Sequence, residues 1–323
     1  MSRAGAPQAT SAAPADADAA AVVRRGTAYG FGAYAIWGIF PLYFVLLKPA
    51  GPLEILAHRI LWTLLLCLVV LAFRRDLRWL AGMARQPRRT AAVGLAGTVI
   101  AVNWTVYTFA VLTGHVAEAA LGYFLNPLVT VALGVLVLRE RLRPAQWVAV
   151  GIGAVAAVYL TVDYGRPPWI SLALAFSFAT YGLLKKRLGV SMPALHGLTG
   201  ETLLLAPAAI ALWVWLGATG EQTFVGQGGW HTVALMSAGV ATAVPLLLFA
   251  AAASRVPLVT IGLLQFVAPV LQLMCAVLLG EQLTLSRWVG FGIVWVALAV
   301  LTLDSVRVGR ARRLARAAES AAV

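Results

Sequence analysis

Residues 116–159, VAEAALGYFLNPLVTVALGVLVLRERLRPAQWVAVGIGAVAAVY, carry a pattern that returns at residues 256–301, VPLVTIGLLQFVAPVLQLMCAVLLGEQLTLSRWVGFGIVWVALAVL. In both copies a glycine opens an apolar run and a proline breaks it, and a lone glutamate, a tryptophan and a second glycine follow at fixed spacing. The paired positions are Gly122 and Gly262, Pro127 and Pro269, Glu140 and Glu281, Trp147 and Trp288, and Gly151 and Gly292. Self-similarity at a fixed offset predicts a duplicated architecture.

The offset between the two copies, 281 − 140 = 141 residues, extends outward along the chain. Ala96-Gly97 aligns with Ala238-Gly239, and residues 35–38 align with 179–182. A membrane-spanning helix needs ~20 apolar residues, so each half has room for about five helices. An odd number of crossings inverts the second half relative to the first. Secondary transporters built in this way hold their site near the midplane, between the halves.

The composition predicts a polytopic membrane protein. The 323 residues are 61% hydrophobic and only 11% charged, whereas soluble domains carry about 25% charged residues. Long continuous apolar runs favour helices over a barrel, because every backbone amide in the hydrocarbon must be paired internally. The expected fold is therefore all-α, with ten helices in the ranges 27–47, 53–73, 90–111, 116–138, 144–161, 169–184, 193–216, 231–253, 256–279 and 283–303.

Four segments are expected. Residues 1–26 are rich in Ala, Pro and Asp, without the apolar core of a signal peptide, and are predicted to form a disordered cytoplasmic tail. Residues 27–162 and 163–305 form the two five-helix repeats, and 306–323 a basic cytoplasmic tail.

The basic residues test this topology, because Lys and Arg are retained on the cytoplasmic side. With both termini inside, 21 of the 25 lie in inner segments and only Lys48, Arg166 and Arg287 lie in outer loops. The net charge of +13 is therefore read as topological, and nucleic acid is not an expected partner.

Four motifs together resemble one family: YAIWGIFPLYF (34–44), EILAHRILW (54–62), LGYFLNPL (121–128) and the loop that contains Glu140. The chain looks like a member of the EamA family, in the drug/metabolite transporter superfamily, over residues 27–303. The resemblance implies a permease or exporter of the bacterial inner membrane that moves amino-acid-like or drug-like molecules, with an effect on chloramphenicol susceptibility.

Arg59 and Glu201 are the two charges predicted to lie inside helices, at equivalent repeat positions 142 residues apart. A buried Arg is costly without a partner, and intramembrane ionisable residues are functional candidates by default. Three readings stay open: Arg59 recognises an anionic substrate and pairs with Glu201 in one state, it pins Glu54 or Glu118, or it reaches an outer headgroup. A solitary Glu201 would instead favour its protonated form and make the proton a coupling partner.

Further candidates surround these two charges. The predicted substrate-binding and translocation residues are Trp37, His58, Arg59, Asn103, Tyr107, Glu118, Tyr123, Asn126, Glu201 and Gln265. Pro127, Pro245 and Pro269 are expected to interrupt helices and act as hinges, although packing kinks explain them equally well. Glu140 and Glu281 are expected to cap helices or to pair with nearby arginines.

An enzyme is not expected. The sequence has no HExxH motif and no GxxxxGK[ST] phosphate cradle, and no cofactor or metal is predicted. Its two cysteines both fall inside apolar runs. The expected activity is alternating-access transport of a small metabolite, and the alternative is a helical membrane enzyme or scaffold.

Overall fold

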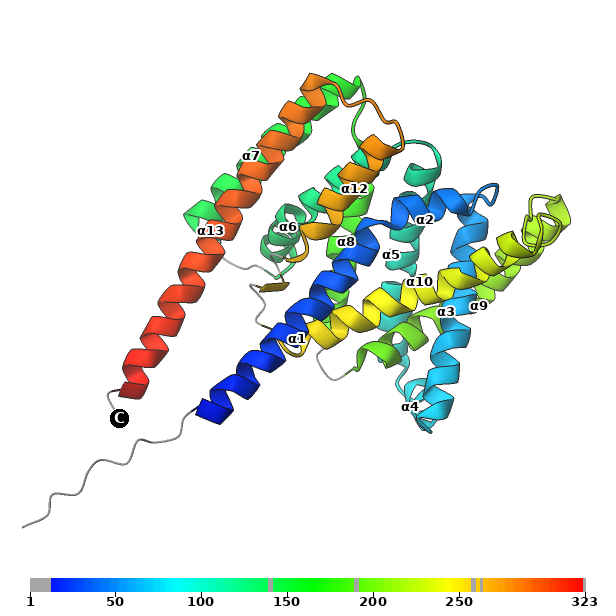
Figure 1. Cartoon of the computed structure of the whole chain (residues 1–323), viewed down its shortest axis with the longest axis horizontal. Coiled ribbons are helices and arrows are strands. Elements are labelled where there is room, and N and C mark those ends of the chain that lie inside the picture. Colours follow the sequence, from blue (N-terminus) through cyan, green and yellow to red (C-terminus); the bar gives the residue numbers. More distant parts are fainter. Residues whose placement is uncertain (1–12, 139–141, 189–191, 257–259, 262–263, 322–323) are drawn as a thin grey trace, which may run out of the picture.

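The computed structural model describes residues 13–138, 142–188, 192–256, 260–261, 264–321. Every regular element in these ranges is an α-helix, which confirms the predicted all-α class. The helices (Figure 1) are α1 Ala13–Gly38, α2 Phe40–Leu46, α3 Pro52–Phe73, α4 Arg78–Ala84, α5 Pro87–Leu112, α6 Val116–Leu138, α7 Pro144–Tyr164, α8 Trp169–Leu188, α9 Ala194–Thr219, α10 Gly229–Ala253, α12 Val267–Leu278 and α13 Leu285–Ala321.

Seven helices are long and apolar enough to cross a membrane, and the bent pair α1 and α2 makes an eighth candidate span. Two shorter apolar helices lie within α8 and α12, at Trp169–Lys185 and Val267–Leu278. Together these elements account for the ten predicted positions.

Three predicted boundaries change. Helix α1 begins at Ala13, inside the tail predicted to be disordered, because the run APADADAAA is rich in the strongest helix former. Helix α13 continues to Ala321 through the basic tail, whose Ala, Leu and Arg residues also favour helix. The Arg-rich loop after α3 contains the short helix α4.

The proline predictions are only partly right. Helices α6 and α10 continue through Pro127 and Pro245, so the predicted interruptions there are wrong; neighbouring side chains and helices tolerate the freed carbonyls. Pro269 lies in the first turn of α12, directly after a turn at residues 265–266, where its missing N–H costs nothing. The sharpest break was not predicted: the chain bends by 43° at Ile39, where Pro41 opens α2.

The packing follows the duplication. Three helix pairs join equivalent elements of the two halves: α3 with α9, α6 with α12, and α7 with α13. Helix α1 is equivalent to α8, and α10 is equivalent to α5. The contact of α1 with α10 therefore has a counterpart in the contact of α8 with α5, and both contacts are present. In Figure 1, α7 and α13 lie side by side along one edge, away from α3, α9 and α10. This pattern is that of two inverted repeats around a pseudo-twofold axis.

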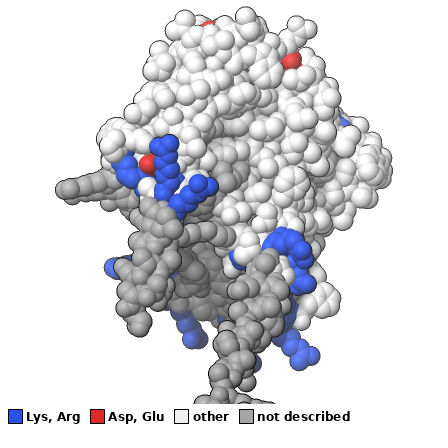
Figure 2. All heavy atoms as spheres, turned by 60° about the vertical axis from the view of Figure 1, so that its left-hand side comes forward, with Lys and Arg blue, Asp and Glu red and all other residues white. Residues whose placement is uncertain are grey.

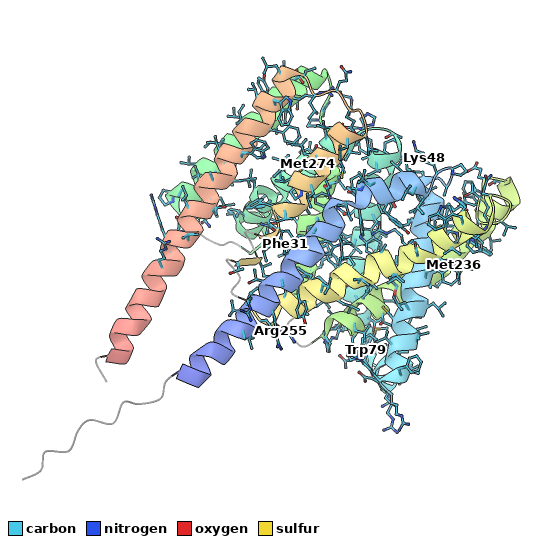
Figure 3. All side chains as sticks on the ribbon, viewed as in Figure 1. Phe31, Lys48, Trp79, Met236, Arg255 and Met274 are labelled. Carbon is cyan, nitrogen blue, oxygen red and sulfur yellow. The ribbon has the colours of Figure 1, made fainter. Side chains whose placement is uncertain are left out.

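The Lys and Arg side chains gather toward one end of the molecule, the lower end in the figures. Most Lys and Arg on the face in Figure 2 gather in its lower part, and the upper part is largely uncharged. The start of α1 and the end of α13 both lie toward that lower end (Figure 1), and Arg255 and Lys48 lie toward opposite ends (Figure 3). Both described chain ends therefore lie toward the basic end, and the orientation of that end toward the cytoplasm stays a prediction.

Candidate functional site

Arg59 lies on α3 and is only 3% exposed. Its Nε donates a hydrogen bond to Thr242 Oγ1 of α10 at 3.1 Å, which links the two halves. Its Nη1 is buried and has no hydrogen-bond partner among the described residues. The guanidinium therefore keeps donor capacity for a molecule that the protein itself does not supply.

Aromatic rings form the wall around this cation. The Arg59 Cζ lies 4.4 Å from the Trp104 ring centroid, 5.3 Å from that of Phe44 and 5.9 Å from that of Phe40. A cation over aromatic faces is stabilised by the ring quadrupoles. The rings therefore offset part of the cost of burying the guanidinium.

Tyrosine side chains extend this wall toward α6. Tyr107 stacks edge-on against Tyr123, with ring centroids 5.6 Å apart, and both lie within electrostatic reach of Arg59. The Tyr107 hydroxyl is buried and has no hydrogen-bond partner in the described structure. The Tyr123 hydroxyl donates to Asn103 Oδ1 at 3.0 Å.

Asn103 is a junction between three helices of the two halves. Its Oδ1 accepts from Tyr123 of α6. Its Nδ2 donates to Leu174 O at 3.1 Å and to Ser177 Oγ at 2.9 Å, both on α8. Both polar atoms of the Asn103 side chain therefore have hydrogen-bond partners within the protein. These hydrogen bonds hold the Tyr123 hydroxyl against α5 and α8.

The break in the first helix creates a second polar point near the centre. Pro41 has no N–H, so the Trp37 carbonyl loses its partner four residues ahead. Gln272 of α12 compensates: its Nε2 donates to Trp37 O at 3.2 Å, and Cys275 Sγ lies 3.6 Å from Gly38 O. The Oε1 of Gln272 is buried without a partner among the described residues. Gln272 and Thr242 were not predicted from the sequence, where their only signal is that each lies three residues from a helix proline.

Glu201 of α9 is buried but has partners of its own. Its carboxylate accepts from Lys185 Nζ at 2.7 Å and from the Tyr181 hydroxyl at 3.1 Å, both on α8. Because Thr242 is the hydrogen-bond partner of Arg59, the predicted Arg59–Glu201 pair is wrong for this conformation.

Geometry explains why the pair does not form. Arg59 and Glu201 each lie seven residues after the first residue of their helix, about 10 Å along its axis at 1.5 Å per residue. Helices α3 and α9 run in opposite directions: Glu54, near the start of α3, accepts from the backbone of Thr223 beyond the end of α9 at 2.7 Å. The inverted repeat therefore places the two charges at different depths, each about 10 Å from a different end of this antiparallel helix pair.

Glu118 and Glu281 lie at the end of the bundle, outside the central cluster. Glu118 accepts from Arg166 Nη2 at 3.0 Å, so the alternative in which Arg59 pins it is wrong, and Glu54 is likewise bound by Thr223. Glu281 accepts from the backbone of Val116 and Ala117 at the first turn of α6, the second at 2.9 Å, which confirms its predicted capping role. Glu140 lies outside the described residues.

The other predicted residues lie around the cluster without a shared centre. His58 points to a separate pocket between α3 and α9. Asn126 is buried, and its Oδ1 has no partner among the described residues. Gln265 is half-buried in the turn before α12. No group of three His, Cys, Asp or Glu side chains suited to a metal lies in the described part of the chain.

The model of the EamA-like transporter family matches residues 24–162 and again residues 168–303, once for each repeat. The chain belongs to the EamA-like transporter family. The two matches coincide with the two halves that pack around the pseudo-twofold axis, and they confirm the family suggested by the motifs.

Relatives within this EamA-like family are similar over nearly their whole length. Protein RarD of Streptomyces exfoliatus is 51% identical over 90% of this chain and 92% of its own. An uncharacterized transporter of Pseudomonas aeruginosa is 43% identical over 90% and 97%, and Protein RarD of Escherichia coli is 37% identical over 88% and 95%. A solved structure named only as a crystal structure of a protein is 21% identical, with a TM-score of 0.57 over 86% of this chain and 97% of its own, and supports the fold alone. The chain is a multi-pass membrane transporter of the EamA-like family.

Proposed function

We propose that this protein is a secondary transporter that moves a small zwitterionic or amphipathic metabolite across the bacterial inner membrane by alternating access, with Arg59 as the group that recognises the anionic end of the substrate. The observation that carries the proposal is the buried Arg59, whose Nη1 has no hydrogen-bond partner among the described residues. A buried donor without an acceptor is costly, so such a group is retained where a ligand supplies the acceptor.

Other buried polar atoms on α5, α6 and α12 are candidates for further substrate contacts. Tyr107 offers a hydroxyl, and Asn126 Oδ1 and Gln272 Oε1 offer acceptors that no described residue satisfies. An anionic group on the substrate would accept from Arg59, and a donor group would suit the two amide oxygens. Aromatic rings from α2 and α5 supply apolar contact, which suits an amino-acid-like or amphipathic body better than a sugar or a metal ion.

The two-half construction supports alternating access. Arg59 belongs to the first half, whereas its partner Thr242 and the residue Gln272 belong to the second. A substrate that draws Arg59 away from Thr242 interacts differently with two arrangements of the halves, and this differential affinity is what drives a conformational change. Proton coupling stays a prediction.

The test is a metabolite uptake and efflux screen in liposomes that contain the purified protein. We expect saturable movement of a small zwitterion or amphiphile by the wild-type protein and loss of that movement in Arg59→Ala. Arg255→Ala is the matched control, because Arg255 is exposed and bonds to Ser254 and Ala251 of its own helix end. Movement of inorganic ions alone, or wild-type rates in a folded Arg59→Ala protein, contradicts the proposal.

Chloramphenicol is one compound to include in the screen. A relative from Pseudomonas aeruginosa, 31% identical over 88% of this chain, is named chloramphenicol-sensitive protein RarD. An effect on chloramphenicol susceptibility is part of the present proposal, and the same liposomes measure whether the compound is transported or inhibits transport. Deletion and overexpression in the host, scored by minimal inhibitory concentration, test the effect in cells.

A further inference from the structure

A pocket of about 290 Å³ opens between α3 and α9, apart from the Arg59 cluster. Its lining is almost entirely apolar and aromatic, and comprises His58, Leu61, Trp62, Leu65, Ile210, Trp213 and Phe224. Leu65 and Ile210 are each about half exposed on these spanning helices, so the pocket opens toward the lipid. No Lys, Arg, Asp or Glu is among the lining residues.

His58 supplies one polar group to this pocket. It is 2% exposed, and its ring stacks on Phe224 with centroids 4.6 Å apart. The Trp62 indole N–H donates to His58 Nδ1 at 3.0 Å. An indole N–H can only donate, so Nδ1 is the acceptor and the ring proton lies on Nε2. The geometry therefore describes a neutral imidazole with an N–H at Nε2.

This Nε2–H has no acceptor in the described structure. The nearest acidic atom is Glu54 Oε1 at 4.0 Å, beyond hydrogen-bond distance. Glu54 Oε1 is already used, because it accepts from the backbone of Thr223 at 2.7 Å and from that of Phe224 at 3.0 Å. The donor of His58 is thus left for something other than Glu54.

Trp213 of α9 supplies a second donor in the same pocket. Its Nε1 is buried and has no hydrogen-bond partner among the described residues. Trp213 lies six residues before the end of α9 and His58 six residues after the start of α3, and these two helix ends adjoin. Both residues therefore lie at the same level of the helix pair, about 9 Å along the helices from that end.

We infer that this pocket binds a small neutral amphiphile through a carbonyl oxygen, which accepts from His58 Nε2–H and Trp213 Nε1–H while its apolar body occupies the aromatic lining. Buried polar groups are normally satisfied, and two unsatisfied donors in one apolar pocket indicate an acceptor supplied from outside the chain. The absence of charged residues from the lining excludes recognition of an ion there. A pocket of this size suits a compact small molecule.

The level of the two donors decides between the sources of such a carbonyl. A helix of 22 residues, such as α3, spans about 33 Å, close to the thickness of the hydrocarbon core. Groups about 9 Å inside its end lie below the level of phospholipid ester oxygens. The acceptor is therefore carried into the hydrocarbon by a membrane-dissolved molecule.

The experiment uses the full-length protein in phospholipid nanodiscs and the probe 4-butylbenzophenone, a neutral ketone that is itself photoreactive. Cross-linked peptides are identified by mass spectrometry as the probe concentration is raised. We expect saturable labelling of the segments 58–65 and 210–213. Labelling that rises in proportion to concentration, without saturation, overturns the inference.

Four variants separate hydrogen bonding from shape. His58→Phe and Trp213→Phe each remove a donor but keep an aromatic ring, and each is expected to raise the half-saturating concentration about fivefold. His58→Gln restores a side-chain N–H and is expected to recover most of the affinity. Trp215→Phe is the matched control, because Trp215 is half exposed on α9 and is not among the pocket residues.

Two further outcomes decide the proposal. Equal half-saturating concentrations for the wild-type protein and the His58→Phe Trp213→Phe double variant contradict it. A phosphatidylcholine with benzophenone next to its ester group is run in parallel: if this lipid labels the same segments with the same dependence on the donors, the source is a lipid ester and the inference is wrong. Binding is read without transport, so the result is independent of the proposed function.

Discussion

Arg59 and Glu201 occupy equivalent positions of the two repeats, yet their surroundings are opposite in kind. Arg59 has one hydrogen bond, to Thr242, aromatic faces around it and a buried nitrogen without a protein partner. Glu201 has both a cation and a hydroxyl within hydrogen-bond distance. The Arg59 side chain thus keeps a nitrogen without a hydrogen-bond partner among the described residues, whereas the Glu201 carboxylate is paired. The repeat therefore places a charge at the equivalent position of each half, and the neighbouring helices decide which of the two charges keeps an unused hydrogen-bonding atom.

The largest expected effect separates function from stability at these two positions. Arg59→Met is expected to reduce transport at least tenfold, because a hydrogen bond to a charged group contributes about 1.5–3 kcal/mol. Its thermal unfolding midpoint is expected not to fall, since the variant removes a buried charge that is only partly compensated. Transport in liposomes and unfolding in detergent are measured on the same preparation. Intact transport together with a lower midpoint would show that Arg59 is structural.

Glu201→Met is expected to show the converse pattern. It leaves Lys185 without its carboxylate, and the unfolding free energy should fall by about 1–2 kcal/mol, a range reduced because Lys185 is 34% exposed. The Lys185→Met Glu201→Met double variant should recover part of this loss, because no unpaired charge remains. A double-mutant cycle on thermal unfolding measures the coupling. A coupling energy of zero would show that the pair does not exist in the membrane protein.

Two repeat-related glycines sharpen the comparison at the level of packing. A Cβ on Gly239 would overlap the backbone carbonyl carbon of Trp62, whereas a Cβ on Gly97 would meet the Glu201 carbonyl oxygen at 3.2 Å. Gly239→Ala is therefore expected to destabilise the protein by about 1–3 kcal/mol, and Gly97→Ala by less. Thermal unfolding of the two single variants is the measurement, and an equal loss in both would contradict the close approach of α3 and α10.

The smallest expected effects lie at the two ends of the α7 and α13 pair. Arg143 donates to Asp304 through Nε at 2.8 Å and also through Nη2, whereas Arg287 Nε lies 3.9 Å from Asp163. Asp163 and Asp304 occupy equivalent positions, 304 − 163 = 141 residues apart, whereas Arg143 and Arg287 lie three residues out of that register. Asp304→Asn is expected to cost up to about 1 kcal/mol and Asp163→Asn less, because partly exposed ion pairs are weak. A larger loss for Asp163→Asn, in the same unfolding assay, would reverse the ranking.

Much of the fold followed from local patterns. Long apolar runs predicted the helices, and the fixed offset predicted the inverted halves. The starts of α6 at Val116 and of α7 at Pro144 were placed correctly. The bend at Ile39 was not predicted, because Pro41 permits both a kinked helix and two helices. In the structure the chain forms two helices, and Gln272 of α12 donates to the Trp37 carbonyl at the break between them.

The sequence by itself determined the class of the protein, because hydrophobicity, charge asymmetry and repeat offset are properties of the chain that survive any arrangement of its helices. It also identified Arg59 as a buried charge. Only the tertiary structure decided the hydrogen-bond partners of the two charges. Thr242, the partner of Arg59, lies in the other half, 183 residues away, and Lys185 forms an ion pair with Glu201. The reason is physical. In an inverted repeat, equivalent residues lie at opposite levels of the membrane, and which side chains meet depends on helix crossings that no local pattern encodes.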